Sequence, residues 1–230
     1  MLAWCEEFGA KPDQDYVKRS NTSNKAIDEG SAFYGVISPE EPISGVYHDL
    51  SYIVFPYHDN HAWVVSLCVG SAGFRNDFDL AASPGLRRRF LRLVDDNGFI
   101  KSDFSDIDSN LGAAFIEKVP HLRKVLHTYR SVLPACQVVQ HPESPEGEAT
   151  LRAFLALYAD VRGWPTNNAH RKAIEAAIKA GSTTSTAVDD FAQTRALLLE
   201  RKCLVLQGAP GTGKTRLAKE LAASLGAEVF

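Results

Sequence analysis

The chain has 230 residues, of which 45% are hydrophobic and 23% are charged, and its formal net charge is -3 at pH 7. This composition excludes wholesale disorder, and the length suits one large domain or two small ones. The slightly negative charge excludes a global basic field that would recruit nucleic acid, so any DNA contact must come from a local patch.

The first predicted elements are strands of a mixed α/β module. Residues 32–37 form one candidate strand, and the runs 52–57 and 62–69 are stronger candidates because they are rich in β-branched and aromatic residues. Four polar residues separate these two runs, which predicts a hairpin. The run 62–69 is apolar on both faces and is predicted to be a central, doubly covered strand. Pro56 has no N–H to donate, so we expect it near a strand end.

Helical patterns alternate with further irregular segments. The polar stretch 11–24 is interpreted as a loop or a surface helix. Ser83 and Pro84 predict a helix start, followed by an apolar stripe that ends at Val94. A cleaner stripe with i, i+3, i+4, i+7 spacing predicts a helix over 122–133. Residues 135–139 then have the pattern of a returning strand.

Prolines and glycine in 141–147 interrupt this pattern and indicate a boundary. Amphipathic helices are predicted over 151–161 and 169–180, and the small polar run 181–186 is the best linker candidate. A capping box at Thr186 predicts another helix, which extends to residue 201 and leads into a short apolar strand. The predicted organisation is a recognition or regulatory module at 1–142, a helical extension at 143–180, a linker at 181–186 and a nucleotide-binding segment at 187–230.

Cysteines and hydropathy are typical of a soluble cytoplasmic protein. The four cysteines form no Cys-x-x-Cys pair, and Cys68 and Cys203 lie in apolar runs, which favours small buried side chains in a reducing compartment. No apolar run approaches the roughly 18 residues of a membrane span, so no membrane partner is expected. Residues 1–7 also lack the basic and apolar regions of a signal peptide.

One segment near the C-terminus indicates a specific chemistry. It fits the phosphate-binding pattern G-x-x-x-x-G-K-[ST] and lies between an apolar run, 203–207, and a helical apolar stripe. Glycines allow the backbone to turn its N–H groups inward around phosphates, and a helix N-terminus adds positive potential. The eight residues are Gly208, Ala209, Pro210, Gly211, Thr212, Gly213, Lys214 and Thr215.

The segment 206–218 resembles the Walker A segment of AAA+ ATPases, with its closest likeness to the branch that contains McrB-type restriction ATPases. The resemblance covers 187–230 only. It implies the fold class α/β, in which the N-terminal module and its helices precede the start of a P-loop NTPase (AAA+) domain. It also implies that residues 208–216, of which Arg216 is the last, bind ATP or GTP. Lys214 and Thr215 are then the catalytic residues, and Thr215 is the Mg²⁺ ligand.

The same resemblance implies a homo-oligomeric ring that acts with a partner nuclease on DNA in a restriction or defence system. Hydrolysis in this class needs a Walker B acidic residue and an arginine finger, both of which we expect beyond Phe230. The 230-residue chain alone is therefore expected to bind nucleotide weakly and to lack appreciable NTPase activity.

Alternative functions remain open. Superfamily 1 helicases carry a similar loop, and the distinctive function can instead be ligand or nucleic-acid binding within residues 1–180. For DNA binding the candidates are Arg87, Arg88, Arg89 and Arg92, which otherwise form a solvated helix face. The aromatic residues Tyr52, Phe55, Tyr57 and Trp63 are interpreted as sheet core or as a base-stacking pocket. For His58 and His61 a polar turn is favoured over a metal site, because no further ligand pair accompanies them.

Overall fold

The chain divides into two compact units, Met1–Thr183 and Thr184–Phe230. The boundary lies inside the predicted linker 181–186. The computed structural model describes residues 1–42, 45, 49–70, 85–101, 111–182, 195, 198–199 and 214–225. The predicted strand 203–207, Ser83 with Pro84, and most of the predicted helix up to residue 201 lie outside the described residues.

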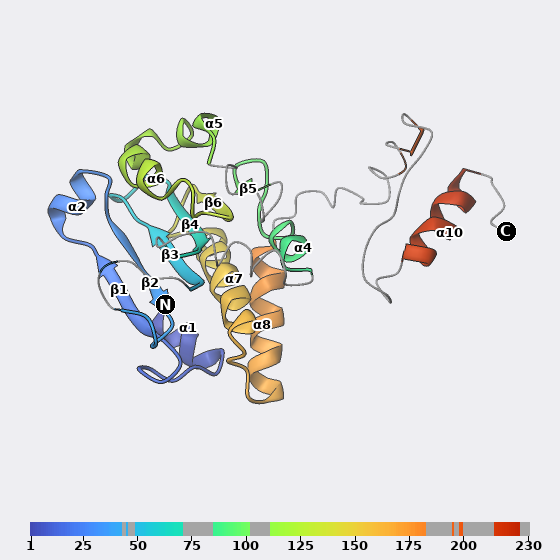
Figure 1. The fold of residues 1–230 in the computed structure, drawn as a ribbon, viewed down its shortest axis with the longest axis horizontal. Helices are drawn as coiled ribbons and strands as arrows, with labels where there is room; N and C mark the ends of the chain where they lie inside the picture. Colours follow the sequence, from blue (N-terminus) through green and yellow to red (C-terminus); the bar gives the residue numbers. More distant parts are fainter. Residues whose placement is uncertain are drawn as a thin grey trace. The chain divides into compact units, whose positions relative to one another are not determined.

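A single antiparallel sheet organises the N-terminal unit within the described residues. Its six strands lie in the order β1-β2-β3-β4-β6-β5, and every neighbouring pair is antiparallel (Figure 1). The unit is therefore mixed α/β as predicted, and its sheet differs from the parallel sheets of doubly wound α/β domains. The strands are β1 (Val17–Asn21), β2 (Phe33–Ile37), β3 (Ser51–Phe55), β4 (Trp63–Cys68), β5 (Phe99–Ile100) and β6 (Ala135–Val139).

The central strands confirm the sequence predictions closely. β3 and β4 form the expected hairpin, with Ser51 opposite Cys68 and Phe55 opposite Val64. Pro56 directly follows the last residue of β3, where its missing N–H removes no ladder hydrogen bond. β4 lies between β3 and β6 and is buried along nearly its whole length, as its apolar pattern on both faces predicted.

The edge of the sheet contradicts one prediction. Residues within 11–24, interpreted from sequence as a loop or surface helix, contain β1, which pairs with β2 from Val17 opposite Ile37 to Asn21 opposite Phe33. β1 is polar because an edge strand is half exposed, so its sequence lacks the apolar alternation of inner strands. The two-residue strand β5 at the other edge was likewise not predicted.

Helix α7 (Pro145–Val161) packs against the centre of the sheet, contacting β3, β4 and β6. The Tyr52 hydroxyl on β3 donates to the Leu151 carbonyl of α7 at 3.2 Å, which ties the helix to the strand. Helix α1 (Leu2–Glu7) packs on α7, where Arg152 forms an ion pair with Glu7. The apolar stripe predicted over 151–161 is thus the stripe that covers the sheet.

Helix α8 (Asn168–Gly181) lies beside α7 (Figure 1). A Cβ on Gly181 would lie 2.3 Å from the Ala149 carbonyl oxygen, so the close approach of the two helices requires glycine at this position. Gly181, predicted as the first linker residue, is consequently the buried end of α8. The helical extension predicted at 143–180 belongs to the same compact unit as the sheet.

Two other helices are shorter than their patterns predicted. The helix expected after Ser83 begins only at Leu86, because Gly85 takes the N-cap position with a left-handed φ of 78°. The 122–133 stripe is divided between a 3-10 turn, a short α-helix and a following loop. Its apolar residues are buried in all three, except for the half-buried Tyr129. The remaining elements are α2 (Asn24–Asp28), α4 (Leu86–Phe90), α5 (Ala113–Ile116), η1 (Pro120–Leu122) and α6 (Arg123–Tyr129).

The hydrophobic core joins both faces of the sheet to the helices, and it contains three of the cysteines. Cys5, Cys68 and Cys136 are free thiols and are buried, which confirms the prediction for Cys68. Burial raises the pKa of the Cys5 thiol to about 11. Among the described helices, none combines the length and the apolar character needed to cross a membrane.

The described part of the C-terminal unit consists mainly of helix α10 (Lys214–Ser224). The sequence predicts a helix directly after the G-x-x-x-x-G-K-[ST] pattern, and the first residue of α10 is the lysine of that pattern, Lys214. Leu221 is buried on the predicted apolar face, whereas Leu217 and Ala218 are half-buried. The sequence pattern therefore located this helix correctly.

Candidate functional site

The predicted phosphate-binding residues divide between described and undescribed parts of the chain. Gly208 through Gly213 lie outside the described residues, and Lys214, Thr215 and Arg216 form the first turn of α10. The Thr215 side chain is exposed. An eleven-residue helix that begins at Lys214 has its free N–H groups and the positive end of its dipole at the end that follows the predicted loop 208–213.

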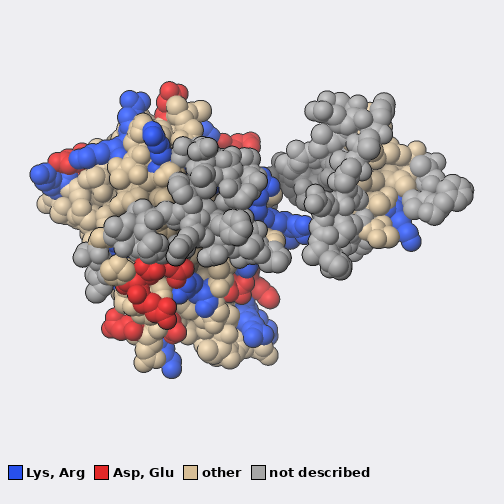
Figure 2. All heavy atoms as spheres, viewed as in Figure 1, with Lys and Arg blue, Asp and Glu red and all other residues tan. Residues whose placement is uncertain are grey.

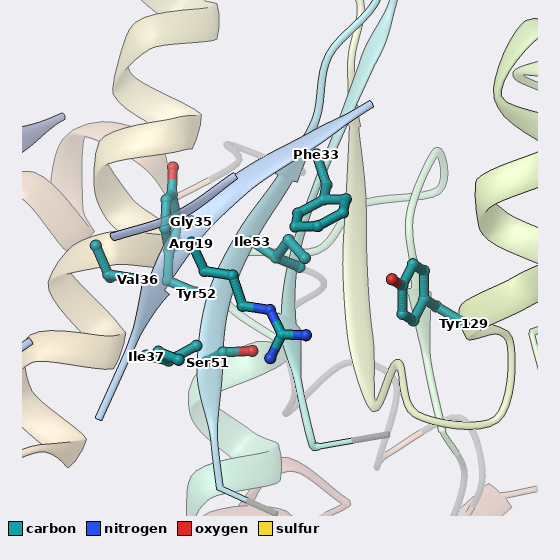
Figure 3. Close-up of a pocket in the computed structure, with 9 residues that line it drawn as sticks. All are labelled: Arg19, Phe33, Gly35, Val36, Ile37, Ser51, Tyr52, Ile53 and Tyr129. Carbon is teal, nitrogen blue, oxygen red and sulfur yellow. The ribbon is translucent and has the colours of Figure 1, made fainter. Parts of the chain in front are cut away.

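A second candidate site is a recess on the sheet of the N-terminal unit, centred on Arg19 (Figure 3). Arg19 of β1 lies opposite Gly35 of β2, which in turn lies opposite Ile53 of β3. Residues that are opposite each other across a ladder share one face of a sheet. Because Gly35 has no side chain, the row is open at its middle position.

Gly35 is required by the backbone as well as by the recess. A Cβ on this residue would lie 2.0 Å from the Tyr52 carbonyl oxygen on the neighbouring strand. A larger residue would therefore force the β2 and β3 backbones apart. The same strand geometry that demands glycine creates the open position beside the Arg19 side chain.

Aromatic and hydroxyl groups surround the Arg19 guanidinium. In Figure 3 it extends between Ser51 of β3 and Tyr129 at the end of α6, with the Phe33 ring nearby. Tyr129 meets Phe33 edge to face at 6.4 Å and stacks on Phe55 at 5.9 Å, so its ring is held on two sides. The remaining lining residues are Val36, Ile37, Tyr52 and Ile53, together with Gly35.

Burial and charge act in opposite directions on Tyr129. Burial raises the pKa of its phenol, and the nearby Arg19 opposes this rise. The phenol is consequently neutral at physiological pH and keeps a proton to donate. Arg19 itself donates a hydrogen bond to the Gly45 carbonyl, which holds the guanidinium over the recess. The site thus combines a fixed cation, a hydroxyl donor and two aromatic walls.

A groove between α4, α7 and α8 gathers positive charge from distant parts of the sequence. Two adjoining hollows of about 410 and 530 Å³ share Arg89, Glu175 and Ile178 in their walls. The Arg89 guanidinium also forms an ion pair with Asp160 at 2.5 Å. The cations that line the groove are Arg89 and Arg92 from the α4 segment, and Arg171 and Lys179 from α8.

The arginine cluster lies on a largely exposed face, as the solvated-face interpretation predicts. Arg88 and Arg92 are exposed and Arg89 is half-buried beside the core, while Leu86 and Phe90 are buried. The Nε of Arg87 donates to the Lys101 carbonyl at 3.1 Å, so this arginine has a structural contact of its own. Positive and negative side chains are intermingled over the face of the N-terminal unit seen in Figure 2. Any anion site in the groove is therefore local.

The aromatic residues of the hairpin pack in the core. Tyr52 and Phe55 are fully buried, so they offer no ring face to a ligand. Trp63 is half-buried, and its indole N–H donates to the Tyr57 carbonyl at 3.1 Å across the hairpin. The core interpretation is thus confirmed for Tyr52 and Phe55. The aromatic walls of the Arg19 recess, Phe33 and Tyr129, come from β2 and α6.

The histidine-containing turn is a packed polar turn. His58 pairs with Asp28 at 2.9 Å, and the rings of His58, His61 and His121 pack around Tyr57 with centroids 4.7 to 5.2 Å from its centroid. In the described part of the chain, no group of three or more histidine, cysteine or acidic side chains is arranged to hold a metal ion.

Comparisons with protein-family models, with curated proteins and with solved structures each find no match for this chain. The function is therefore argued from the residues themselves. Sequence reasoning missed the Arg19 recess because β1 has no apolar alternation and Tyr129 lies far from it along the chain. The one local signal was a glycine inside a strand pattern, at position 35, which often marks the close approach of another group.

Proposed function

We propose that this protein binds a nucleoside triphosphate together with Mg²⁺ through residues 208–216, within a P-loop NTPase domain of the AAA+ kind. The observation that carries the proposal is the complete G-x-x-x-x-G-K-T sequence followed by a helix that begins at its lysine, Lys214. A glycine-rich turn that binds no nucleotide has no requirement for Lys and Thr at these two positions.

Each residue of the motif has a distinct role in this proposal. The backbone N–H groups of Ala209, Gly211, Thr212 and Gly213 bind the β-phosphate in this proposal, because glycines at 208, 211 and 213 allow conformations that are costly with a Cβ. Pro210 has no N–H to contribute. Lys214 neutralises the β- and γ-phosphates, and the hydroxyl of Thr215 ligates Mg²⁺. Arg216 adds positive charge next to the site. The loop recognises phosphates, so ATP and GTP both remain candidate substrates.

The wider activity follows from the resemblance to McrB-like AAA+ proteins. In this proposal the nucleotide drives rearrangement in a ring-shaped homo-oligomer that acts with a nuclease on DNA, and the N-terminal unit is a recognition or regulatory module. Superfamily 1 helicases share the loop sequence and are the alternative within the same chemistry. Sensor motifs or helicase motifs elsewhere in an intact protein distinguish the two.

Binding of fluorescent ATP and GTP analogues to the full 230-residue chain, with and without Mg²⁺, tests the proposal. We expect Lys214→Ala to weaken binding at least tenfold, and Thr215→Ala to abolish the Mg²⁺ dependence. Lys219→Ala is the matched control, because Lys219 lies on the exposed face of the same helix. Equal affinity in wild type and Lys214→Ala, or no saturable binding of either nucleotide, overturns the proposal.

A second candidate function is nucleic-acid binding by the N-terminal unit. It is favoured by the groove, where Arg89 and Arg92 approach Arg171 and Lys179 from a helix far along the chain. Phosphate contacts by such side chains give affinity that falls steeply with salt. Asp160 and Glu175 in the same walls reduce the net positive charge and make the groove a modest anion site.

Fluorescence anisotropy with unmodified and methylated DNA, at low salt, tests this second function. The double variant Arg92→Gln/Lys179→Gln removes two exposed cations of the groove and should lower the slope of log affinity against log salt by about 1 to 2. Lys25→Gln/Lys172→Gln removes two exposed cations that are not among the groove's lining residues and should have a smaller effect. Absence of binding at low salt contradicts the DNA version.

A further inference from the structure

The residues of the Arg19 recess are typical of a site for a small anion. The argument for this site does not depend on nucleotide binding by residues 208–216. A guanidinium is planar and presents N–H donors in a fork that matches two oxygens of one group. The Gly45 carbonyl fixes one end of the Arg19 side chain, and the row Arg19–Gly35–Ile53 leaves space beside it. The guanidinium is therefore pre-oriented on the sheet surface.

The size of the recess limits what enters it. The free volume of the recess is about 20 Å³, which corresponds to one or two ordered waters. A whole nucleobase or sugar exceeds this space, whereas one small functional group of a larger ligand fits it. The rest of such a ligand must lie outside the recess, beside the half-exposed edge strand β1.

The walls favour a planar group over a tetrahedral one. Phe33 and Tyr129 are set edge to face with centroids 6.4 Å apart, and Tyr129 is held in place by its stacking on Phe55. A flat group that enters between rings and sheet meets the guanidinium edge-on, which is the bidentate geometry of arginine–carboxylate pairs. The neutral Tyr129 phenol supplies a further donor from α6, on the side of the recess away from β1.

We propose that the recess formed by Arg19, Gly35, Ser51, Phe33 and Tyr129 binds a carboxylate group of a ligand whose remainder lies beside the half-exposed edge strand β1. The guanidinium of Arg19 receives the carboxylate oxygens, and the Tyr129 hydroxyl donates to one of them. Phe33 and Tyr129 exclude water from the sides of the bound group. The carrier is a small organic acid or an acidic side chain or C-terminus of a peptide.

Nuclear magnetic resonance of the ¹⁵N-labelled full chain provides a direct test through the Nε–H signal of Arg19. Benzoate is the probe, titrated at constant ionic strength because exposed electrostatics are screened by salt. We expect a saturable shift of this signal with a millimolar Kd, as befits a single small anion. A parallel titration with inorganic phosphate separates a planar carboxylate from a tetrahedral anion.

Variants distinguish specific binding in the recess from non-specific electrostatic binding of anions. Because Arg19→Gln and Arg19→Lys lack the Nε–H signal of Arg19, binding to every variant is followed by the backbone N–H signals of Gly35 and Tyr129, which line the recess. Arg19→Gln should weaken benzoate binding at least tenfold, Arg19→Lys should retain part of the affinity, and Tyr129→Phe should weaken binding two- to fivefold. Arg130→Gln is the matched control, because Arg130 is the exposed neighbour of Tyr129 and its side chain contacts His127, three residues away in the sequence. Tryptophan fluorescence of each variant verifies that the unit is folded.

Three outcomes overturn the proposal. One is a linear, non-saturating shift of the Arg19 signal, and another is tighter binding of phosphate than of benzoate. The third is equal loss of affinity in Arg130→Gln and Arg19→Gln. If Arg19→Gln does not fold, the wild-type titration together with Arg19→Lys still decides between the outcomes. Nucleotide binding by Lys214 is unaffected by any of them, so failure here leaves the proposed function untouched.

Discussion

The two units of this chain present opposite relations between sequence and structure. In the C-terminal unit, eight consecutive residues that end at Thr215 match a pattern that predicts phosphate binding. The described structure of this unit is essentially one helix, α10. In the N-terminal unit no short motif names a function, yet its sheet, helices and core are described in detail. The recess and the groove both appear only once distant segments have come together.

The difference follows from how each kind of site recognises its ligand. A phosphate-binding loop uses main-chain N–H groups and the start of a helix, which are local properties of a continuous segment. The Arg19 recess uses side chains from β1, β2, β3 and α6, so that its geometry depends on strand register and helix packing. A site formed by one continuous segment can therefore be predicted from a single sequence. A composite site, which is formed by side chains from distant segments, can be found only when the fold is known.

The largest expected effect concerns the core that holds the composite sites in place. Phe154 is fully buried and belongs to α7, the helix that packs on the sheet, so Phe154→Ala should lower the free energy of unfolding of the N-terminal unit by about 3–5 kcal/mol. Urea unfolding followed by tryptophan fluorescence measures it cleanly, because Trp4, Trp63 and Trp164 all lie in this unit.

The exposed leucine Leu91 supplies the control for that experiment. Leu91→Ala should change the free energy of unfolding by no more than about 0.5 kcal/mol, since it removes little buried area. Similar losses in Phe154→Ala and Leu91→Ala would show that the α7–sheet contact does not stabilise this unit, and the comparison between the two units would fail.

An intermediate effect is expected at alkaline pH. The pKa of the buried Cys5 thiol rises from 9.0 in the unfolded chain to about 11 in the folded protein. The folded state therefore favours the neutral thiol, and this contribution is fully present below pH 9 and is lost as pH rises toward 11. The loss is on the order of 2 kcal/mol. Tyr16 and Tyr34, whose pKa values burial raises to about 12, extend the decline above this range.

The slope of unfolding free energy against pH between 9 and 11 measures the alkaline effect. Cys5→Ala should flatten this slope, although it also removes packing and lowers stability at neutral pH. An unchanged slope in Cys5→Ala would show that another group is responsible. A flat profile in the wild type would contradict the burial of the ionisable core groups altogether.

The smallest effect belongs to a local helix signal inside the N-terminal unit. The Ser144 hydroxyl accepts from the Gly147 N–H at 3.1 Å and caps α7. Ser144→Ala should cost about 1 kcal/mol in urea unfolding, and Ser144→Thr should retain most of the stability because its hydroxyl also caps. Equal losses in the two variants would indicate that packing rather than capping determines the effect.

Sequence reasoning predicted the inner strands of this fold better than its edges. β2, β3, β4 and β6 were located because buried strands carry a dense apolar and β-branched pattern. β1 was mistaken for a loop or surface helix because one face and one edge of it meet solvent, so its composition resembles a loop. Gly181 was assigned to a linker because composition alone does not reveal a close contact between helices.

The arginine cluster was predicted on its own helix with the correct exposed positions, but its neighbours on α8 were not. Sequence periodicity relates residues within one helix and carries no information about which other helix lies beside it. For the Arg19 recess, the guanidinium, the open glycine position and the Tyr129 ring come from three separate segments. None of the three is unusual in its own segment.

The sequence by itself determined the phosphate-binding motif, the helix that follows it and the central hairpin, since each depends on residues within one short segment. Tertiary structure alone decided that β1 completes the sheet edge, that α7 covers the sheet and that Arg19 faces Tyr129. The physical reason is that strand register and helix packing arise from the summed burial of many side chains. The pattern within one short segment includes only a few of those side chains, so it cannot predict the register or the packing.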